Sequence, residues 1–287
     1  MYLANRAPEL FPGARFAVAH CNFGLRGAES DGDEAFVRAW CAGRGIECLT
    51  ARFDTRAHAA GHGISIEMAA RELRYDWFAR LCRERGFEAV AVAHNADDNA
   101  ETLLLNLLRG TGTRGLCGMG DRDGIVRPLL DTTRAEIRAW MEEHGCAWRE
   151  DSSNADSGPK RNRIRNEVFP VFARINPSFV RTLGEDMRRI AQVDDIADAY
   201  FRAVRPGLTT EDGAIRIPAV LALEHWEYVL WRLTEDYSLS GPTFGKLTAL
   251  LRRYRQEPRG TVTIGGKVFE GNGVKLVVEK ELLSPIR

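Results

Sequence analysis

The stretch EAVAVAHNADDNAETLLLNLLRGTGTRG, residues 88–115, carries a strand pattern, a helix pattern and a glycine-punctuated loop in direct succession. Alanine and valine alternate up to His94, which favours a short β-strand. Leucines recur through residues 97–109 with the spacing of an amphipathic helix. The sequence therefore predicts a strand that ends at His94 and a helix that begins shortly after it.

The same alternation of strand and helix patterns runs through the first 150 residues. Strands are expected at 16–20, 47–53, 88–94 and 125–129, and helices at 30–44, 66–85, 97–109 and 134–144. Strands that alternate with helices of this length predict an α/β fold with a parallel sheet and crossover helices. Ligands on such sheets bind at the carboxyl ends of the strands, where His20 and His94 lie.

The rest of the chain has a different pattern and predicts two further parts. The expected helices are 177–204, 218–237 and 243–254, and the expected strands are 261–264, 267–270 and 274–278, with a turn at Gly265-Gly266. The domain boundaries that follow are a catalytic domain at 1–176, a helical connector at 177–206 and a small α+β domain at 207–287.

Composition narrows the class of protein but does not identify a partner. No run of about 18 apolar residues exists, and the first residues lack a signal-peptide pattern, so we expect a cytoplasmic protein without a membrane span. Six cysteines occur without a C-x-x-C pair, which favours reduced thiols over zinc or disulfides. Forty basic residues balance forty acidic ones. The local basic clusters at 160–165 and 251–259 are a mild indication of phosphate contact.

Three carboxylates gather at the start of the helix after His94. Asp98 and Glu101 are three residues apart and Asp97 and Glu101 are four apart, so one helix face carries their charges. A purely structural reading is available, because acids complement a helix N-terminus and Asn95 can cap it. A functional reading is equally open, because carboxylates hold Mg²⁺ or bind an ammonium group.

The glycine loop and two arginine-bearing segments admit the same pair of readings. Backbone amides around Gly112 can cradle a phosphate, or the glycines can simply end the helix. Asn22 and Arg26, in HCNFGLRGAESD, have no evident packing role, and Arg26 can bind a phosphate with two hydrogen bonds. Arg71 lies four residues after Glu67, and an intrahelical salt bridge is the more common meaning of that spacing.

Together these segments resemble tRNA(Ile)-lysidine synthetase, a family of the PP-loop ATP pyrophosphatases. The resemblance rests on the order of HCNFGLRGAESD, EMAARELRY, AHNADDNAETLLLNLLRGTGTRGLCGM and RPLLDTTRAEIRAWMEEHGCAWREDSSNAD followed by RNRIRNEVFP. It covers about residues 15–180 closely. It implies a Rossmann-like fold of the adenine nucleotide alpha hydrolase type, followed by the helical segment and the small α+β domain.

The resemblance also implies a reaction. ATP would adenylate the anticodon wobble cytidine of tRNA(Ile) with a CAU anticodon and release pyrophosphate. The ε-amine of free L-lysine would then displace AMP and give lysidine. The implied cofactors are ATP and Mg²⁺, and a homodimer is one alternative for the assembly.

Site residues follow from the same resemblance. Asp98 and Glu101 would bind lysine, Asp97 would bind Mg²⁺, and Arg71 would stabilise the phosphates or the adenylated intermediate by its charge. The catalytic residues would be Asp98, Glu101 and Arg71. The remaining expected contacts are His20, Asn22, Arg26, His94 and Gly112 with the nucleotide, and Arg161, Arg163 and Arg165 with tRNA or with the pyrophosphate side of the site.

Departures from the family pattern keep other hypotheses open. Asn95 and Phe23 replace residues that are often histidine in the family, and the 287 residues contain no Ser-Gly-Gly-x-Asp-Ser loop. One hypothesis is therefore an N-terminally truncated enzyme that is inactive in this form. The alternatives are a non-catalytic tRNA-binding remnant, another PP-loop tRNA-modifying enzyme such as a thiolase, and a plain α/β domain.

Overall fold

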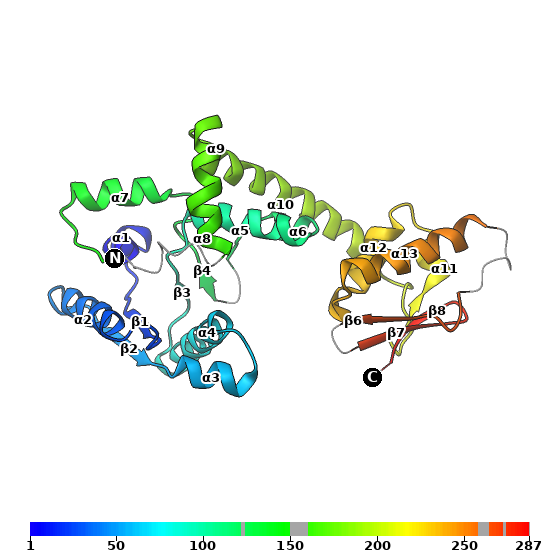
Figure 1. Cartoon of the computed structure of the whole chain (residues 1–287), viewed down its shortest axis with the longest axis horizontal. Coiled ribbons are helices and arrows are strands. Elements are labelled where there is room, and N and C mark those ends of the chain that lie inside the picture. The colour runs from blue at the N-terminus through cyan, green and yellow to red at the C-terminus, as the bar shows by residue number, and fades with distance from the viewer. Residues whose placement is uncertain (122–123, 150–159, 258–263, 272–273, 287) are drawn as a thin grey trace. The chain divides into compact units, whose positions relative to one another are not determined.

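The structure is a computed structural model that describes residues 1–121, 124–149, 160–257, 264–271 and 274–286. The chain forms two compact units (Figure 1). Unit 1 comprises Met1–Arg109 and Gly115–Arg188, and unit 2 comprises Gly110–Arg114 and Arg189–Arg287. The division falls inside helix α10, Phe179–Val204, and not at residues 176 and 206. The boundaries taken from the sequence remain a proposal.

Unit 1 contains two pairs of parallel strands. Strand β1 (Val18–Asn22) pairs with β2 (Cys48–Arg52), and β3 (Val90–Ala91) pairs with β4 (Ile125–Val126). A parallel bridge from Asn95 to Leu129 continues the second pairing. Helices connect the paired strands, as the sequence pattern predicted for an α/β fold. Within the described residues the two pairs form separate two-stranded sheets.

The helices of unit 1 agree with the predicted ones, with additions. Their bounds are α1 Tyr2–Leu10, α2 Ala28–Ala42, α3 Thr55–His62, α4 Ile66–Arg85, α5 Ala96–Arg109, α6 Thr113–Leu116, α7 Arg134–Glu143, α8 Lys160–Arg163, the π-helix η2 Ile164–Val168 and α9 Phe169–Ile175. The ends of α4 coincide with the prediction, because Ser65 caps its first turn and Gly86 ends it with a left-handed backbone. Helix α3 was missed, although Asp54 caps it in the same way.

Side chains that pack against α5 fix the position of its first turn. Ala100 is fully buried, and it packs in one cluster with Ile164 and Phe169 from η2 and α9. The side chain of Asn99 accepts a hydrogen bond of 2.6 Å from the backbone of Met119. The face of α5 that carries Glu101 is therefore held against the segment that contains Arg161 and Arg165.

Unit 2 is a small α+β unit with its own core. Its elements are β5 Ile215–Arg216, α11 Ile217–Leu221, α12 Trp226–Leu233, the 3₁₀-helix η3 Glu235–Tyr237, α13 Gly241–Gln256, β6 Val268–Gly271, β7 Val274–Glu279 and β8 Leu282–Ile286. The strands form an antiparallel sheet in the order β5-β8-β7-β6. Leu230, Leu247 and Leu276 are fully buried in the cluster that joins the helices to this sheet.

The hairpin of unit 2 lies after the position predicted for it. The expected strand at 261–264 lies almost wholly outside the described residues. The hairpin in the structure joins β6 to β7, whereas Gly266 lies before β6 and its backbone donates a 2.7 Å hydrogen bond to Val278. Strand β8 was not predicted. Over the described part of the chain, no helix combines the length and apolar character needed to cross a lipid bilayer.

Candidate functional site

The first turn of α5 is held by a reciprocal pair of hydrogen bonds. The Asp98 carboxylate accepts one from the backbone of Asn95 at 3.1 Å, and the Asn95 side chain accepts one from the backbone of Asp98 at 3.0 Å. This is the capping role that the structural reading of the sequence expected. One carboxylate oxygen of Asp98 is left to face other side chains.

Glu101 is the most deeply buried charged residue of this helix, with 0% of its surface exposed. Arg165 donates hydrogen bonds to both of its carboxylate oxygens, at 2.7 Å from Nε and 3.1 Å from Nη2. The Nε of Arg161 lies 3.3 Å from the same carboxylate. Two arginines from α8 and η2 therefore meet one buried glutamate.

A third arginine, Arg134, approaches the same carboxylates from the start of α7. Its backbone N–H donates a 2.7 Å hydrogen bond to Asp97, and its Nη2 lies 3.4 Å from Asp98 and 3.8 Å from Glu101. A capping box between Thr133 and Glu136 fixes this helix start. We call Asp97, Asp98, Glu101, Arg134, Arg161 and Arg165 the acid–arginine cluster.

Burial and pairing act in opposite directions on the charges of this cluster. Burial raises the pKa of Glu101, and its hydrogen bond with Arg165 opposes that shift. Burial alone would lower the pKa of Arg165, but the hydrogen bond to Glu101 and the charges of Glu101, Asp98 and Asp97 together outweigh it and hold that pKa above its ordinary value. The buried carboxylate of Glu101 therefore depends on its arginine partners to remain charged.

His94, at the end of the β3 segment, lies beside this cluster. Burial lowers its pKa, and the charges of Arg127, Arg161 and Arg74 lower it further, whereas Asp98 opposes them. Its Nδ1 atom is buried and has no hydrogen-bond partner. A neutral ring with an unused polar atom can bind a ligand through that atom.

His20, Asn22 and Arg26 have contacts in a different place, around the start of α2. The Asn22 side chain is buried and donates 3.0 Å hydrogen bonds to Asp31 and Glu34. Arg26 forms a 2.7 Å ion pair with Asp33. Asn22 and Arg26 therefore have a structural role that the sequence did not reveal.

The pKa of His20 is lowered, chiefly by burial and against the nearby charge of Glu34. The nucleotide contacts assigned to all three residues stay predictions.

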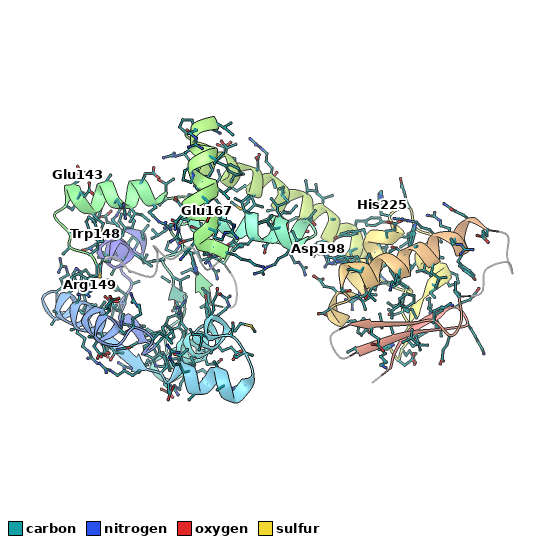
Figure 2. All side chains as sticks on the ribbon, in the orientation of Figure 1. Glu143, Trp148, Arg149, Glu167, Asp198 and His225 are labelled. Carbon is teal, nitrogen blue, oxygen red and sulfur yellow. The ribbon has the colours of Figure 1, made fainter. Side chains whose placement is uncertain are left out.

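The glycine loop belongs to unit 2. A Cβ atom on Gly112 would lie 2.9 Å from the Trp231 ring, so glycine is required there by close packing. Thr113 donates a 2.5 Å hydrogen bond to Asp194. Figure 2 labels Asp198 on the same helix, where it pairs with Arg232 and lies 3.7 Å from Arg114. The described contacts of this loop explain its sequence without a nucleotide.

The remaining predicted residues differ in exposure. Arg163 is well exposed and lies 3.5 Å from Glu167 in its own helical segment. Arg161 is partly exposed and also donates a 2.7 Å hydrogen bond to Thr102. Arg165 faces inward, as described above. Of the three arginines assigned to RNA, Arg163 is the one with its charge directed mainly to solvent.

Asp97 was expected to bind Mg²⁺. One of its carboxylate oxygens accepts the backbone hydrogen bond from Arg134. Nowhere in the described ranges do three or more histidine, cysteine, aspartate or glutamate side chains form a group that could hold a metal. The described residues do not by themselves form a site for a resident cation.

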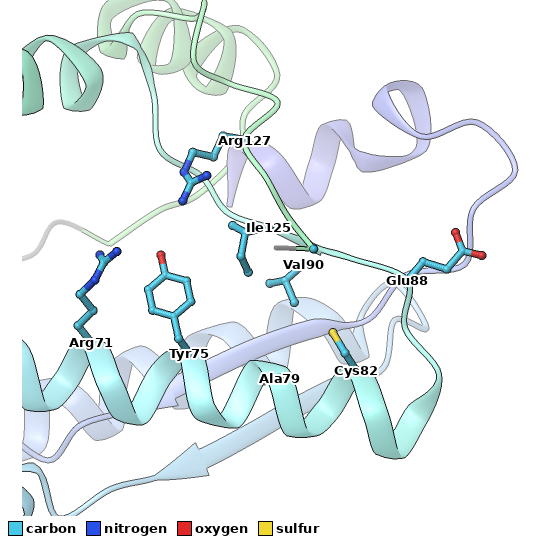
Figure 3. Close-up of a pocket in the computed structure, with 9 residues that line it drawn as sticks. Arg71, Tyr75, Ala79, Cys82, Glu88, Val90, Ile125 and Arg127 are labelled. Atoms are coloured by element: carbon cyan, nitrogen blue, oxygen red, sulfur yellow. The ribbon is translucent and has the colours of Figure 1, made fainter. Parts of the chain in front are cut away.

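A cavity of about 490 Å³ lies between α4 and the β3–β4 pair (Figure 3). Arg71 and Tyr75 line it from α4, and Arg127 lines it from the end of β4. The guanidinium of Arg71 lies 4.8 Å from the centre of the Tyr75 ring. Arg127 was not predicted as a site residue from the sequence, where it lies within the strand expected at 125–129.

Comparison with known proteins shows a consistent set of relatives. The ATP_bind_3 family, described as a PP-loop domain, matches residues 1–172. A tRNA(Ile)-lysidine synthase of Porphyromonas gingivalis is 49% identical over 193 residues, which are 67% of this chain and 42% of that protein. The protein of the same name from Parabacteroides distasonis is 37% identical over 265 residues, 92% of this chain and 58% of that protein.

Two further comparisons concern length and fold. The tRNA(Ile)-lysidine synthase of Chlorobaculum tepidum is 42% identical, and the match covers 74% of this chain and 66% of that protein. The chain thus spans about two fifths to two thirds of the length of these relatives. The solved structure of the U34-tRNA thiolase NcsA from Methanococcus maripaludis, with its 4Fe-4S cluster, matches with a TM-score of 0.52. That match covers 67% of this chain and 66% of that one at 17% identity, and supports the fold alone.

Proposed function

This chain belongs to the PP-loop domain family, and from that membership we propose that it forms lysidine on tRNA(Ile) with a CAU anticodon. In the first step, O2 of the wobble cytidine attacks the α-phosphate of ATP and pyrophosphate leaves. In the second, the ε-amine of lysine, after losing a proton, attacks C2 of the base and AMP leaves. The names of relatives that are 37–49% identical support the substrate class.

The observation that carries this proposal is the acid–arginine cluster. Asp98 and Glu101 face the same side of α5 and already bind the guanidinium of Arg165. A guanidinium and an ammonium group use the same charge-assisted hydrogen bonds to carboxylates. In the proposal, the lysine substrate takes one of these positions on the carboxylates, and the arginines limit how much uncompensated negative charge is buried when the site is empty.

Other residues contribute binding in this proposal. Arg71 stabilises negative charge on the phosphates, and Arg161 and Arg163 contact the RNA backbone. His94, as a neutral ring, hydrogen-bonds the nucleotide. ATP supplies the leaving groups, and Mg²⁺ stays a prediction for neutralising its phosphates.

The test is lysidine formation by this chain from ATP, lysine and a tRNA(Ile) transcript, measured by nucleoside mass spectrometry together with pyrophosphate release. A transcript with uridine at the wobble position is the matched control and should give no product. Pyrophosphate release that occurs without lysine, followed by product only after lysine is added, would support the order of the two steps. A different modified nucleoside would instead favour another PP-loop tRNA-modifying reaction.

A non-catalytic tRNA-binding protein is the second candidate, because the Arg163 side chain is exposed while Asp98 and Glu101 are already paired with Arg165. Tight, salt-dependent binding of tRNA(Ile) without pyrophosphate release or lysidine would favour it over the first.

A further inference from the structure

The hydroxyl of Thr102 connects the backbone of α5 to an arginine of the acid–arginine cluster. Thr102 follows Glu101 directly on this helix and is half-buried. Its Oγ1 donates a 2.9 Å hydrogen bond to the carbonyl of Asp98, and the same atom accepts a 2.7 Å hydrogen bond from Nη2 of Arg161. A threonine hydroxyl has one hydrogen to donate, and Asp98 takes it. The oxygen is therefore oriented as an acceptor for Arg161.

Arg161 is anchored at two neighbouring positions of α5. Its Nε lies 3.3 Å from Oε2 of Glu101, and its Nη2 donates to Thr102. A guanidinium group is planar and rigid, so two anchors fix the orientation of its plane and of its remaining N–H groups. With 39% of its side chain exposed, Arg161 is the most exposed arginine of the acid–arginine cluster. The exposed part of Arg161 is therefore held in one orientation at the surface of unit 1.

Glu101 by itself holds Arg161 less firmly than it holds Arg165. Arg165 donates to both carboxylate oxygens, at 2.7 Å from Nε to Oε1 and at 3.1 Å from Nη2 to Oε2. Arg161 shares Oε2 at the longer distance of 3.3 Å. Short, charge-assisted hydrogen bonds with two parallel contacts are the stronger ones, so Arg165 is the main partner of this carboxylate. Without the Thr102 hydroxyl, Arg161 would keep one long contact, about which its plane could rotate.

The second hydrogen bond is what distinguishes Thr102 from an ordinary helix threonine. A threonine hydroxyl that bonds to a carbonyl one turn earlier is common in helices and has a local, structural role. Thr248 on α13 bonds in this way to the carbonyls of Phe244 and Gly245, each at 3.1 Å. Thr102 has the same kind of bond and in addition accepts from a cation that adjoins Glu101. The local role therefore does not account for the whole environment of Thr102.

We propose that Thr102 is a positioning residue that acts through Arg161 and keeps its guanidinium available to the RNA backbone. This inference rests on the proposed function, in which Arg161 contacts the RNA and Glu101 binds the lysine ammonium group. A guanidinium that turned fully onto Glu101 would remove one phosphate contact from the RNA. It would also place a further cation where the substrate ammonium is proposed to bind. The Thr102 hydroxyl therefore keeps the RNA contact separate from the lysine site.

Binding of a tRNA(Ile) transcript to the full chain, measured by fluorescence anisotropy without ATP or lysine, tests this role. Thr102→Val replaces the hydroxyl by a methyl group, and Thr102→Ser restores the hydroxyl. Thr248→Val is the matched control, because it removes a hydroxyl with the same kind of helical bond. Thr102→Val should weaken tRNA binding about threefold to tenfold, the effect of one misplaced hydrogen bond. Thr102→Ser and Thr248→Val should bind tRNA as the wild type does.

Two further readouts separate an effect on Arg161 from a general loss of structure. In steady-state lysidine formation, Thr102→Val should raise the KM for tRNA about threefold to tenfold and leave the KM for ATP unchanged. The double variant Thr102→Val, Arg161→Gln should bind tRNA no more weakly than Arg161→Gln alone, because no guanidinium is left to orient. Additive losses in the double variant, or a Thr102→Ser variant as weak as Thr102→Val, would overturn the proposal.

Failure of the positioning role and failure of the proposed reaction give different results. If the wild type forms no lysidine, but tRNA affinity falls in Thr102→Val and recovers in Thr102→Ser, the positioning role is supported and the reaction is wrong. If the wild type forms lysidine and Thr102→Val changes neither the tRNA affinity nor the KM for tRNA, the positioning role is wrong. A wild type that does not bind tRNA would also overturn the positioning role.

Discussion

Replacing Glu101 by glutamine should loosen the start of α5. The buried carboxylate accepts two hydrogen bonds from Arg165, at 2.7 and 3.1 Å, and Arg161 lies 3.3 Å away. Removing one partner of a buried ion pair costs about 3–5 kcal/mol. The cost here should be smaller, because Arg165 keeps Asp98 at 3.5 Å and because burial already works against the ionised carboxylate. We expect unit 1 to lose about 1–3 kcal/mol of unfolding free energy.

Hydrogen exchange measured by mass spectrometry is the suitable assay. The chain has two units, so a single melting curve would not report a two-state transition. Amides of α5 and of η2 should exchange about tenfold to a hundredfold faster in Glu101→Gln, while amides of β7 in unit 2 should not change.

Glu167→Gln is the matched control for this prediction. Glu167 lies 3.5 Å from Arg163 on the surface, and both side chains are more than half exposed. Exposed pairs contribute about 0–1 kcal/mol, so this variant should leave the exchange of α5 almost unchanged. If the α5 amides of Glu101→Gln exchange as slowly as those of the control, Glu101 does not hold Arg165 in place.

Three further predictions concern residues that the sequence singled out. Asp98→Asn should raise the KM for lysine about tenfold or more while changing the KM for ATP little, in steady-state assays of lysidine formation; equal losses would remove Asp98 from lysine binding. Gly112→Ala should destabilise unit 2 by about 1–3 kcal/mol through contact with Trp231, seen as faster exchange in α12, with no change in ATP affinity; weaker ATP binding without that destabilisation would restore its predicted nucleotide role. His94 should titrate below its usual pKa of 6.5 in NMR spectra, because burial and the charges of Arg127, Arg161 and Arg74 outweigh Asp98. Below pH 6.5 the folded protein then binds fewer protons than the unfolded chain, so the stability that a neutral His94 contributes is present above pH 6.5 and is lost as the pH falls below it. His94→Gln should remove this dependence of the unfolding free energy on pH. An unchanged pH dependence in the variant would assign it to other groups.

Local signals predicted most elements of unit 1 because they depend on a few neighbouring residues. Ser65 and Gly86 mark the two ends of α4, and the apolar alternation before His94 marks the β3 segment. The same kind of signal was present at Asp54 and was overlooked. Strand β8 was also missed, although it pairs over five residue pairs with the neighbouring β7; its shorter pairing with β5 joins residues that are far apart in sequence.

The sequence by itself determined that Asp97, Asp98 and Glu101 gather at the start of one helix, because a helix repeats every 3.6 residues and brings positions three and four apart together. It could not determine what those carboxylates bind. The ion pairs to Arg134 and Arg165 join residues that are 36 and 64 positions apart, and the packing of α7, α8 and η2 against α5 decides them. The glycine loop shows the same limit. Its residues follow α5 directly, but the chain's tertiary contacts place Gly112 against Trp231, where close packing requires glycine whether or not a phosphate binds.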